Sequence, residues 1–274
     1  MEIIKAIFFG ILEGVTEWLP ITSTGHIILL NEFIHLDVST DFYQLFKVVI
    51  QLGAILAVVL IYFKTIFPFG FGKNKRDAKD TFNLWGKIIV ACLPAAVIGL
   101  LFDDWLEDHL QTGFVVSLML IIYGILFIVI EGKNLGSRKV SDIKDITYKQ
   151  ALGVGGFQLL SLIPGTSRSG ATIIGGLLLG LKRSVAAEFT FFLAIPVMAG
   201  ASLLKVLKYV LEYGFVFGPQ ELIILGTASL VAFLVSMLII KFLLSYIRKH
   251  DFKVFGYYRI VLGLLVILYF TLLK

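Results

Sequence analysis

The sequence predicts an all-α polytopic membrane protein with six transmembrane helices and two re-entrant helix–loop–helix regions. Of its 274 residues, 58% are hydrophobic and only 16% are charged, whereas a soluble domain carries roughly 25% charged residues. The apolar residues are also gathered into runs of the length that crosses a bilayer, about 20 residues. Composition and segmentation therefore agree on one membrane-embedded domain, residues 1–274.

Six uninterrupted apolar stretches are predicted to be full transmembrane helices, because each is long enough to cross the hydrocarbon core. In chain order they are Tyr43–Phe63, Trp85–Phe102, Phe114–Ile130, Val185–Leu211, Leu222–Tyr246 and Tyr257–Leu273.

Two further apolar regions, residues 2–34 and 147–181, are interrupted by polar residues around Pro20 and Pro164. Each predicts two half-helices around a polar turn. Such a turn is tolerated at membrane depth only where protein buries it or water reaches it. We therefore expect both regions to be re-entrant.

Loop charges predict the orientation, since lysine and arginine gather on the cytoplasmic side. The basic loops contain Lys64, Lys73, Lys75, Arg76 and Lys79, then Lys133, Arg138, Lys139, Lys144 and Lys149, then Arg248, Lys249 and Lys253. The opposite loops are acidic, for example at Asp37 and Asp41. The first interrupted region then enters the membrane from outside and the second from inside.

This alternation predicts an inverted-topology repeat of residues 1–131 and 147–273, each an interrupted region followed by three spans. Local sequences agree weakly when Leu19-Pro20-Ile21-Thr22-Ser23 is set beside Ile163-Pro164-Gly165-Thr166-Ser167. In inverted repeats the ligand site lies near the midplane, where the interrupted helices meet.

The remaining composition excludes several classes of protein. A single cysteine, Cys92, excludes an internal disulfide framework and a multi-thiolate metal site. The net charge of +5 is explained by cytoplasmic loops that face anionic lipid, so we predict no nucleic-acid partner. Since Ile3–Leu12 runs straight into Glu13, we also expect no cleavable signal peptide.

Glu13 and Glu17 are the first candidate site residues. Their spacing of four places both carboxylates on one helix face, where like charges repel. Inside a membrane the pair needs a shared proton or a cation, and Mg²⁺ or Ca²⁺ suits hard carboxylate oxygens. The alternative is a solvated pair at the outer surface.

The turn after Glu17 offers the hydroxyls of Ser23 and Thr24 together with the imidazole of His26. These groups permit a nucleophile with a nearby base, or an imidazole that itself attacks. Ser23 is alternatively the N-cap of the following half-helix, and His26 a buried histidine with satisfied hydrogen bonds.

The second turn predicts an anion site. Arg168 is an intramembrane cation with a bidentate donor fork, and the half-helix behind it would direct N–H groups at an anion. Thr166, Ser167, Ser169 and Gly170 surround it. Alternatively, Arg168 only forms a salt bridge with Glu13 or Glu17. Gln51, Gln158 and Glu188 are the remaining polar groups near membrane depth, and we assign them supporting roles around the site.

Carboxylates for a metal, an arginine in an anion nest and a serine–histidine pair describe a phosphoryl-transfer site. In a membrane such a site suits a phosphorylated lipid. An inverted repeat with a midplane anion site is also how secondary transporters are built, so a lipid-phosphate transporter or flippase is the alternative.

Two motifs carry a resemblance to a known family. The first motif is Glu13-Gly14-Val15-Thr16-Glu17-Trp18-Leu19-Pro20 with Ser23-Thr24-Gly25-His26. The second is Pro164-Gly165-Thr166-Ser167-Arg168-Ser169-Gly170-Ala171-Thr172. Both resemble the signatures of bacterial undecaprenyl-diphosphate phosphatases. The resemblance extends through Val49-Ile50-Gln51-Leu52-Gly53 and Ala187-Glu188-Phe189, and so covers most of the chain.

The resemblance implies hydrolysis of undecaprenyl diphosphate to the monophosphate and phosphate, which recycles the carrier lipid for cell-wall synthesis, and a link to bacitracin resistance. It also implies dependence on Mg²⁺ or Ca²⁺ and a site that opens to the outer face of the bacterial plasma membrane. Carried over by motif, Glu13 and Glu17 would hold the metal or tune the attacking group. Ser23 and His26 would be nucleophile and base, and Arg168 would clamp the diphosphate with Ser167 and Thr166 alongside. The oligomeric state is left open, with a homodimer as one option.

Overall fold

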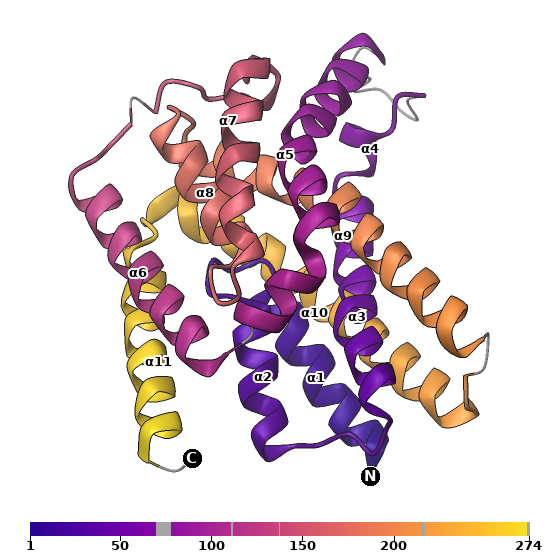
Figure 1. Ribbon diagram of the computed structural model, residues 1–274. Coiled ribbons are helices and arrows are strands. Elements are labelled where there is room, and N and C mark those ends of the chain that lie inside the picture. The colour runs from indigo at the N-terminus through magenta and orange to yellow at the C-terminus, as the bar shows by residue number, and fades with distance from the viewer. Residues whose placement is uncertain (70–77, 111, 137, 215–216, 273–274) are drawn as a thin grey trace.

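The computed structural model describes residues 1–69, 78–110, 112–136, 138–214 and 217–272, and within them the regular structure is helical (Figure 1). The first half contains α1 (Glu2–Thr16), α2 (Ser23–Phe33), α3 (Thr40–Ile61), α4 (Phe63–Ile66), α5 (Ala78–Leu110) and α6 (Gly113–Gly132). The second contains α7 (Tyr148–Leu159), α8 (Arg168–Leu178), α9 (Arg183–Tyr213), α10 (Pro219–Lys249) and α11 (Lys253–Leu272). Short 3₁₀ turns cover Ile143–Asp145 and Leu160–Leu162.

Six of these helices are long and apolar enough to cross a membrane, which confirms the six predicted spans. They are α3, the Ala78–Phe102 part of α5, α6, α9, α10 and α11. Several helices extend past the predicted ends, since α9 begins at Arg183 and α10 continues to Lys249. Long basic side chains continue a helix beyond the apolar core because their charged ends reach toward water.

The two interrupted regions each form two short helices joined by a turn, which in the second region begins with the 3₁₀ turn Leu160–Leu162. α1 and α2 have 15 and 11 residues, and α7 and α8 have 12 and 11. At 1.5 Å per residue, none of the four reaches the roughly 30 Å that a bilayer core requires. Figure 1 shows α1 and α2 in the lower half of the molecule and α7 and α8 in the upper half.

The turns before α2 and α8 end in the same unusual conformation. Thr22 has φ 72° and ψ 109°, Ser167 has φ 71° and ψ 119°, and each side chain accepts from the backbone N–H of a glycine three residues on. Thr22 therefore corresponds to Ser167, and the alignment that set Thr22 beside Thr166 is wrong by one residue here. The alternative that Ser23 caps the helix is also wrong, because Thr22 is the cap.

The most extensive contacts between helices join the first half of the chain to the second. α1 packs on α10, α7 packs on α5, α3 packs on α9, and α6 packs on α11. Close approach requires glycine at particular crossings: a Cβ on Gly155 of α7 would collide with the Ala91 backbone of α5. The apolar side chains that face outward, such as Leu101, Leu211 and Leu238, fit a lipid-facing surface.

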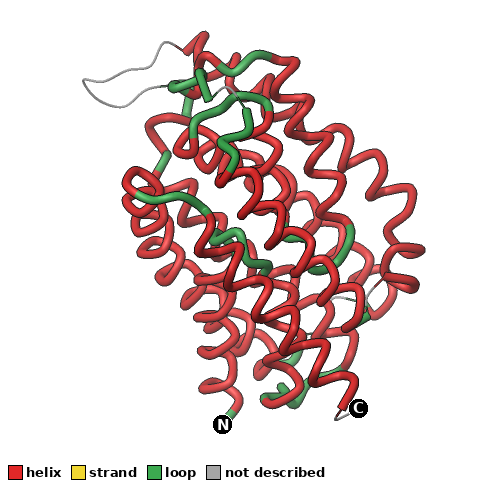
Figure 2. The backbone as a smooth tube through the Cα atoms, turned by 90° about the vertical axis from the view of Figure 1, so that its left-hand side faces the viewer, coloured by secondary structure: helices red, strands yellow, loops and turns green. Residues whose placement is uncertain are grey.

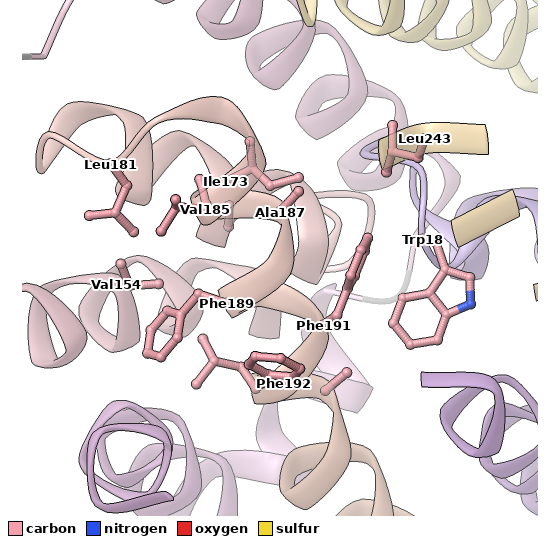
Figure 3. Packing of buried hydrophobic residues seen from close by; sticks show 14 of the residues in the cluster. Trp18, Val154, Ile173, Leu181, Val185, Ala187, Phe189, Phe191, Phe192 and Leu243 are labelled. Carbon is pink, nitrogen blue, oxygen red and sulfur yellow. The ribbon is translucent and has the colours of Figure 1, made fainter. Parts of the chain in front are cut away.

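The main apolar core surrounds the start of α9 and reaches the first turn. Phe189, Phe191 and Phe192 are fully buried, and Trp18 meets Phe191 edge to face with ring centroids 5.3 Å apart (Figure 3). This contact fixes the turn after α1 against α9, in the middle of the molecule.

Some connections lie at the two ends of the helix bundle, whereas other loop segments lie at mid-height, as the tube view shows (Figure 2). Both chain ends lie at the bottom of Figure 1, whereas the basic α6–α7 connection lies at the top. Of the predicted basic residues, Lys73, Lys75 and Arg76 fall outside the described part of the chain.

Candidate active site

The two turns meet at a cavity of about 170 Å³ between the two halves. Its wall combines polar residues from both turns with apolar residues of α9, which are Glu17, Thr22, Ser23, Gln51, Ser161, Pro164, Gly165, Ser167, Arg168, Ser169, Val197, Met198 and Ala201. The two interrupted regions therefore come together as predicted, for example through the contact between Glu17 and Arg168, which lie 151 residues apart in the sequence.

Glu17 lines the cavity and contacts side chains from both halves of the chain. One carboxylate oxygen accepts the Ser23 hydroxyl at 2.6 Å, and the other accepts Nη2 of Arg168 at 3.0 Å. The opposite side of the guanidinium is held as well, since Nη1 donates to the Thr190 carbonyl of α9 at 2.9 Å. The hydroxyl and the guanidinium are thus directed into the cavity by one carboxylate.

Ser169 connects the backbones of the two turns. Its hydroxyl lies 3.3 Å from the Glu17 carbonyl and 3.2 Å from the Leu19 carbonyl. Ser167, which lies 3.1 Å from Ser169 oxygen to oxygen, accepts from the Gly170 N–H at 3.1 Å. This N–H already donates to the cap Ser167. The predicted role of Gly170 in binding phosphate is therefore limited to letting a ligand approach the backbone closely.

Glu13 is fully buried beneath Glu17, and neither of its carboxylate oxygens has a hydrogen-bond partner in the described structure. The charged groups that interact with it electrostatically are Glu17 and Arg168. The alternative of a solvated pair at the outer surface is therefore wrong, because Glu13 is inaccessible and Glu17 is only 7% exposed.

Gln158 precedes its helix cap, Ser167, by the same number of residues as Glu13 precedes Thr22. It is also buried, and its amide nitrogen and oxygen have no partner among the described residues. Of the other two supporting residues, Gln51 lines the cavity, while half-buried Glu188 of α9 is not among its lining residues.

His26 is held away from Ser23. Its Nδ1 lies 2.6 Å from the Thr22 carbonyl, and its Nε2 lies 2.7 Å from the hydroxyl of Tyr258 on α11. Because a carbonyl only accepts, Nδ1 carries a proton and Nε2 of the neutral ring accepts from Tyr258. The structure pairs Ser23 with Glu17 and not with His26, in agreement with the alternative of a satisfied buried histidine.

The structure gives no direct support for two of the predicted phosphate ligands, Thr166 and Thr24. Thr166 is fully buried and its hydroxyl has no partner in the described structure. Thr24 lies in α2, but its side chain falls outside the described part of the chain.

Sequence reasoning missed Tyr258 and Arg259. Arg259 is fully buried and donates to the carbonyls of Pro20, Gly165 and Thr166 at 2.8–3.1 Å. An ionisable residue inside a predicted span is a functional signal by default. Arg259 carried that signal within the predicted span Tyr257–Leu273, but it was not among the predicted site residues.

A cation site of protein ligands alone is not formed, since the described residues contain no cluster of three or more histidine, cysteine or acidic side chains. Glu13 and Glu17 are the residues that fit a hard divalent cation, because the Glu13 oxygens are buried without a partner beside a second carboxylate. The remaining ligands would come from water and from a phosphorylated substrate.

Comparison with known proteins gives a consistent result. The family model described as bacitracin resistance protein BacA matches residues 6–265. An undecaprenyl-diphosphatase of Enterococcus faecalis is 60% identical over 266 residues, covering 97% of this chain and 96% of its own length. Undecaprenyl-diphosphatases of Streptococcus thermophilus and Acetivibrio thermocellus are 56% and 54% identical, covering 98% and 100% of this chain and 93% and 100% of their own.

Proposed function

Because the chain belongs to the bacitracin resistance protein BacA family, we propose that it hydrolyses undecaprenyl diphosphate to undecaprenyl phosphate and phosphate. The observation that carries the proposal is the pair of contacts at Glu17, which direct the Ser23 hydroxyl and the Arg168 guanidinium into one cavity. A hydroxyl beside a base and a cation that binds anions are the parts that phosphoryl transfer requires.

Ser23 is the nucleophile in this proposal, and Glu17 takes its proton. The Ser23 oxygen bonds to the terminal phosphorus, the bond from that phosphorus to the bridging oxygen breaks, and undecaprenyl phosphate leaves. Water then releases phosphate from the serine. The original expectation of His26 as base is replaced by Glu17, because the hydrogen bond of Ser23 goes to Glu17 at 2.6 Å.

Arg168 binds the phosphoryl oxygens. Its orientation is fixed by Glu17 and the Thr190 carbonyl before substrate arrives, and its Nε has no partner in the described structure. Preorganised donors of this kind stabilise charge that develops in the transition state without reorganisation. The alternative that Arg168 only pairs with an acidic residue describes the same contact and the same assembled site.

We assign Mg²⁺ or Ca²⁺ as the cofactor, held by Glu13 and Glu17 together with oxygens of the substrate. When bound, a divalent cation would neutralise charge on the diphosphate. The buried, unpartnered carboxylate of Glu13 supports this assignment, because a charge in that position requires a cation or a proton.

The apolar part of the cavity suits the start of the lipid tail. Val197, Met198 and Ala201 of α9 face the same cavity as Ser23 and Arg168, so a diphosphate at the polar end would leave the first prenyl unit against α9. This combination favours a phosphorylated lipid over a free phosphate ester.

For the membrane arrangement we propose two re-entrant helix pairs, α1–α2 and α7–α8, in an inverted repeat with the site open to the outer face. Their short lengths and the matching caps Thr22 and Ser167 support the repeat. The basic connection at one end and acidic Asp37 and Asp41 at the other support the orientation.

The test is release of phosphate from undecaprenyl diphosphate by the purified protein in detergent, with and without EDTA. We expect release by the wild type, loss with EDTA, and a decrease of at least about 100-fold in Arg168→Ala, the size expected for a transition-state donor. Arg138→Gln is the matched control: this arginine also pairs with a buried glutamate, Glu131, which keeps Arg183 as a second partner.

Phosphate release by Arg168→Ala at the wild-type rate would refute the proposed site. A wild type that releases no phosphate but moves the lipid between leaflets would favour the transporter alternative.

A further inference from the structure

Arg259 of α11 joins three separate segments of the chain behind the active site. Nη1 donates to the Pro20 carbonyl of the first turn at 3.1 Å. Nη2 lies 2.8 Å and 2.9 Å from the Gly165 and Thr166 carbonyls of the second turn. Nη2 and Nε also face the Met119 and Leu120 carbonyls of α6, at 3.3 and 3.5 Å.

Among the residues that the structure describes, the charge of Arg259 is buried without an acidic partner. The residue is 0% exposed, and within the described residues no carboxylate lies at ion-pair distance from it. Its guanidinium also lies over the ring of Tyr123, whose centroid is 5.5 Å away. A buried cation without an acidic partner is costly, so the carbonyls of the turns must supply the compensation.

The positions of those carbonyls connect Arg259 to the chemistry. Pro20 lies two residues before the cap Thr22, and Thr166 lies immediately before the cap Ser167. Ser23 and Arg168 directly follow the two caps. One guanidinium therefore holds the backbones from which the proposed nucleophile and the phosphate-binding cation project.

The position of Arg259 is itself fixed from outside the site. α11 packs against α6 so closely that a Cβ on Gly256 would collide with the Gly124 carbonyl, and one on Gly263 with the Ser117 carbonyl. This helix pair fixes the backbone of Arg259. The hydrogen bonds of its guanidinium then fix both turns relative to that backbone.

We propose that Arg259 is a positioning residue that sets the separation between Ser23 and Arg168. The inference rests on the proposed function, in which both residues act on the same phosphoryl group. Arg259 is not among the residues that line the cavity, so it acts through the turns and not on the substrate.

Arg259→Lys and Arg259→Met separate charge from geometry. Lysine keeps the charge, but its single ammonium lacks the planar fork that reaches carbonyls of both turns. We expect both variants to lower kcat by at least about tenfold, because displacing reacting groups by about 1 Å costs up to about 100-fold. KM should change by less than about threefold, since Arg168 still binds the diphosphate. Arg138→Lys and Arg138→Met, made in an arginine of the α6–α7 connection, are the matched controls.

Hydrogen–deuterium exchange of the full-length variants tests whether Arg259 holds the two turns, and it does so without an activity measurement. Both Arg259 variants should exchange faster in the peptides that carry residues 17–23 and 163–170, while peptides of α3 and α10 stay at the wild-type level. Unchanged exchange at both turns, or a kcat within twofold of wild type in both variants, would overturn the proposal. Faster exchange throughout the chain would overturn it too, because Arg259 would then support the fold as a whole. A wild type that releases no phosphate would refute the proposed function, and the exchange data would still decide whether Arg259 holds the turns.

Discussion

Glu17 illustrates how one side chain can organise a reaction. Its two oxygens have different partners, Ser23 and Arg168, which come from the two halves of the chain. A carboxylate with only one of these contacts would either orient a nucleophile or neutralise an arginine. With both contacts, the distance between nucleophile and anion-binding cation is fixed before substrate arrives.

The shared contact predicts that Glu17 and Ser23 act as one unit. Glu17→Gln keeps the size but loses the base, and we expect kcat to fall by about 100-fold or more, as for loss of a positioned general base. Ser23→Ala should cost a similar factor, and the double variant little more than either alone. The measurement is kcat for all three proteins. If the fold-loss of kcat in the double variant equals the product of the two single fold-losses, the residues act independently.

His26 gives a second prediction at this scale, because both ring nitrogens already have partners. Tyr258→Phe removes the donor at Nε2, so we expect stability to fall by about 1 kcal/mol, the usual contribution of one hydrogen bond. The same change should lower kcat by less than about tenfold. Thermal unfolding and phosphate release check the two parts.

A trapped reaction intermediate then identifies the nucleophile directly. We expect the phosphoryl group on Ser23, and a phosphoryl group mapped to His26 would contradict the assignment.

In the part of the chain that the structure describes, the starts of α2 and α8 have strained backbone. Thr22 and Ser167 both have φ near 70°, a region that side chains with a Cβ rarely adopt. Such strain costs about 1–3 kcal/mol and is kept where the surrounding structure enforces it. Here it turns the chain sharply enough to place Ser23 and Arg168 at the first position of each helix.

Thr22→Gly should therefore separate stability from activity. Glycine relieves the strain, and replacing a cap residue by glycine costs only a few tenths of a kcal/mol, so we expect the melting temperature to stay the same or rise. Activity should fall, because the turn that carries Ser23 is no longer held in one conformation. The control is Ser39→Gly: Ser39 caps α3 from an ordinary φ of −62°, so its loss should lower stability slightly without affecting kcat. A Thr22→Gly protein that is both less stable and fully active would contradict this interpretation of the turn.

The elements also show what sequence can predict. The six spans follow from hydropathy alone, and both turns were found from Pro20, Pro164 and the polar residues around them. The register between the turns was wrong by one residue, because residue letters do not reveal which hydroxyl caps a helix. Tyr258 and Arg259 were missed because they lie more than 230 residues from His26 and Pro20, so that only the tertiary fold brings them together.

For the molecule as a whole, the proposed orientation decides which side of the membrane supplies substrate. If the basic connections face the cytoplasm, the half formed by α1 and α2 enters from outside, and the cavity lies where the two halves meet. The proposed site, open to the outer face, requires this orientation.

The orientation can be tested with single cysteines, since Cys92 is the only native one. In a Cys92→Ala background, Asp37→Cys samples the α2–α3 connection and Lys133→Cys samples the α6–α7 connection. In intact cells a membrane-impermeant maleimide should label position 37 and leave position 133 unlabelled until the cells are opened, because basic connections are retained in the cytoplasm. Labelling of position 133 alone from outside would show that the orientation is the reverse of the one proposed. The α7–α8 half, with Arg168, would then lie at the outer face. Labelling of both positions in intact cells would place the two connections on the same side. In that case α1–α2 and α7–α8 could not enter from opposite faces, and the inverted repeat would have to be abandoned although the cavity itself would remain.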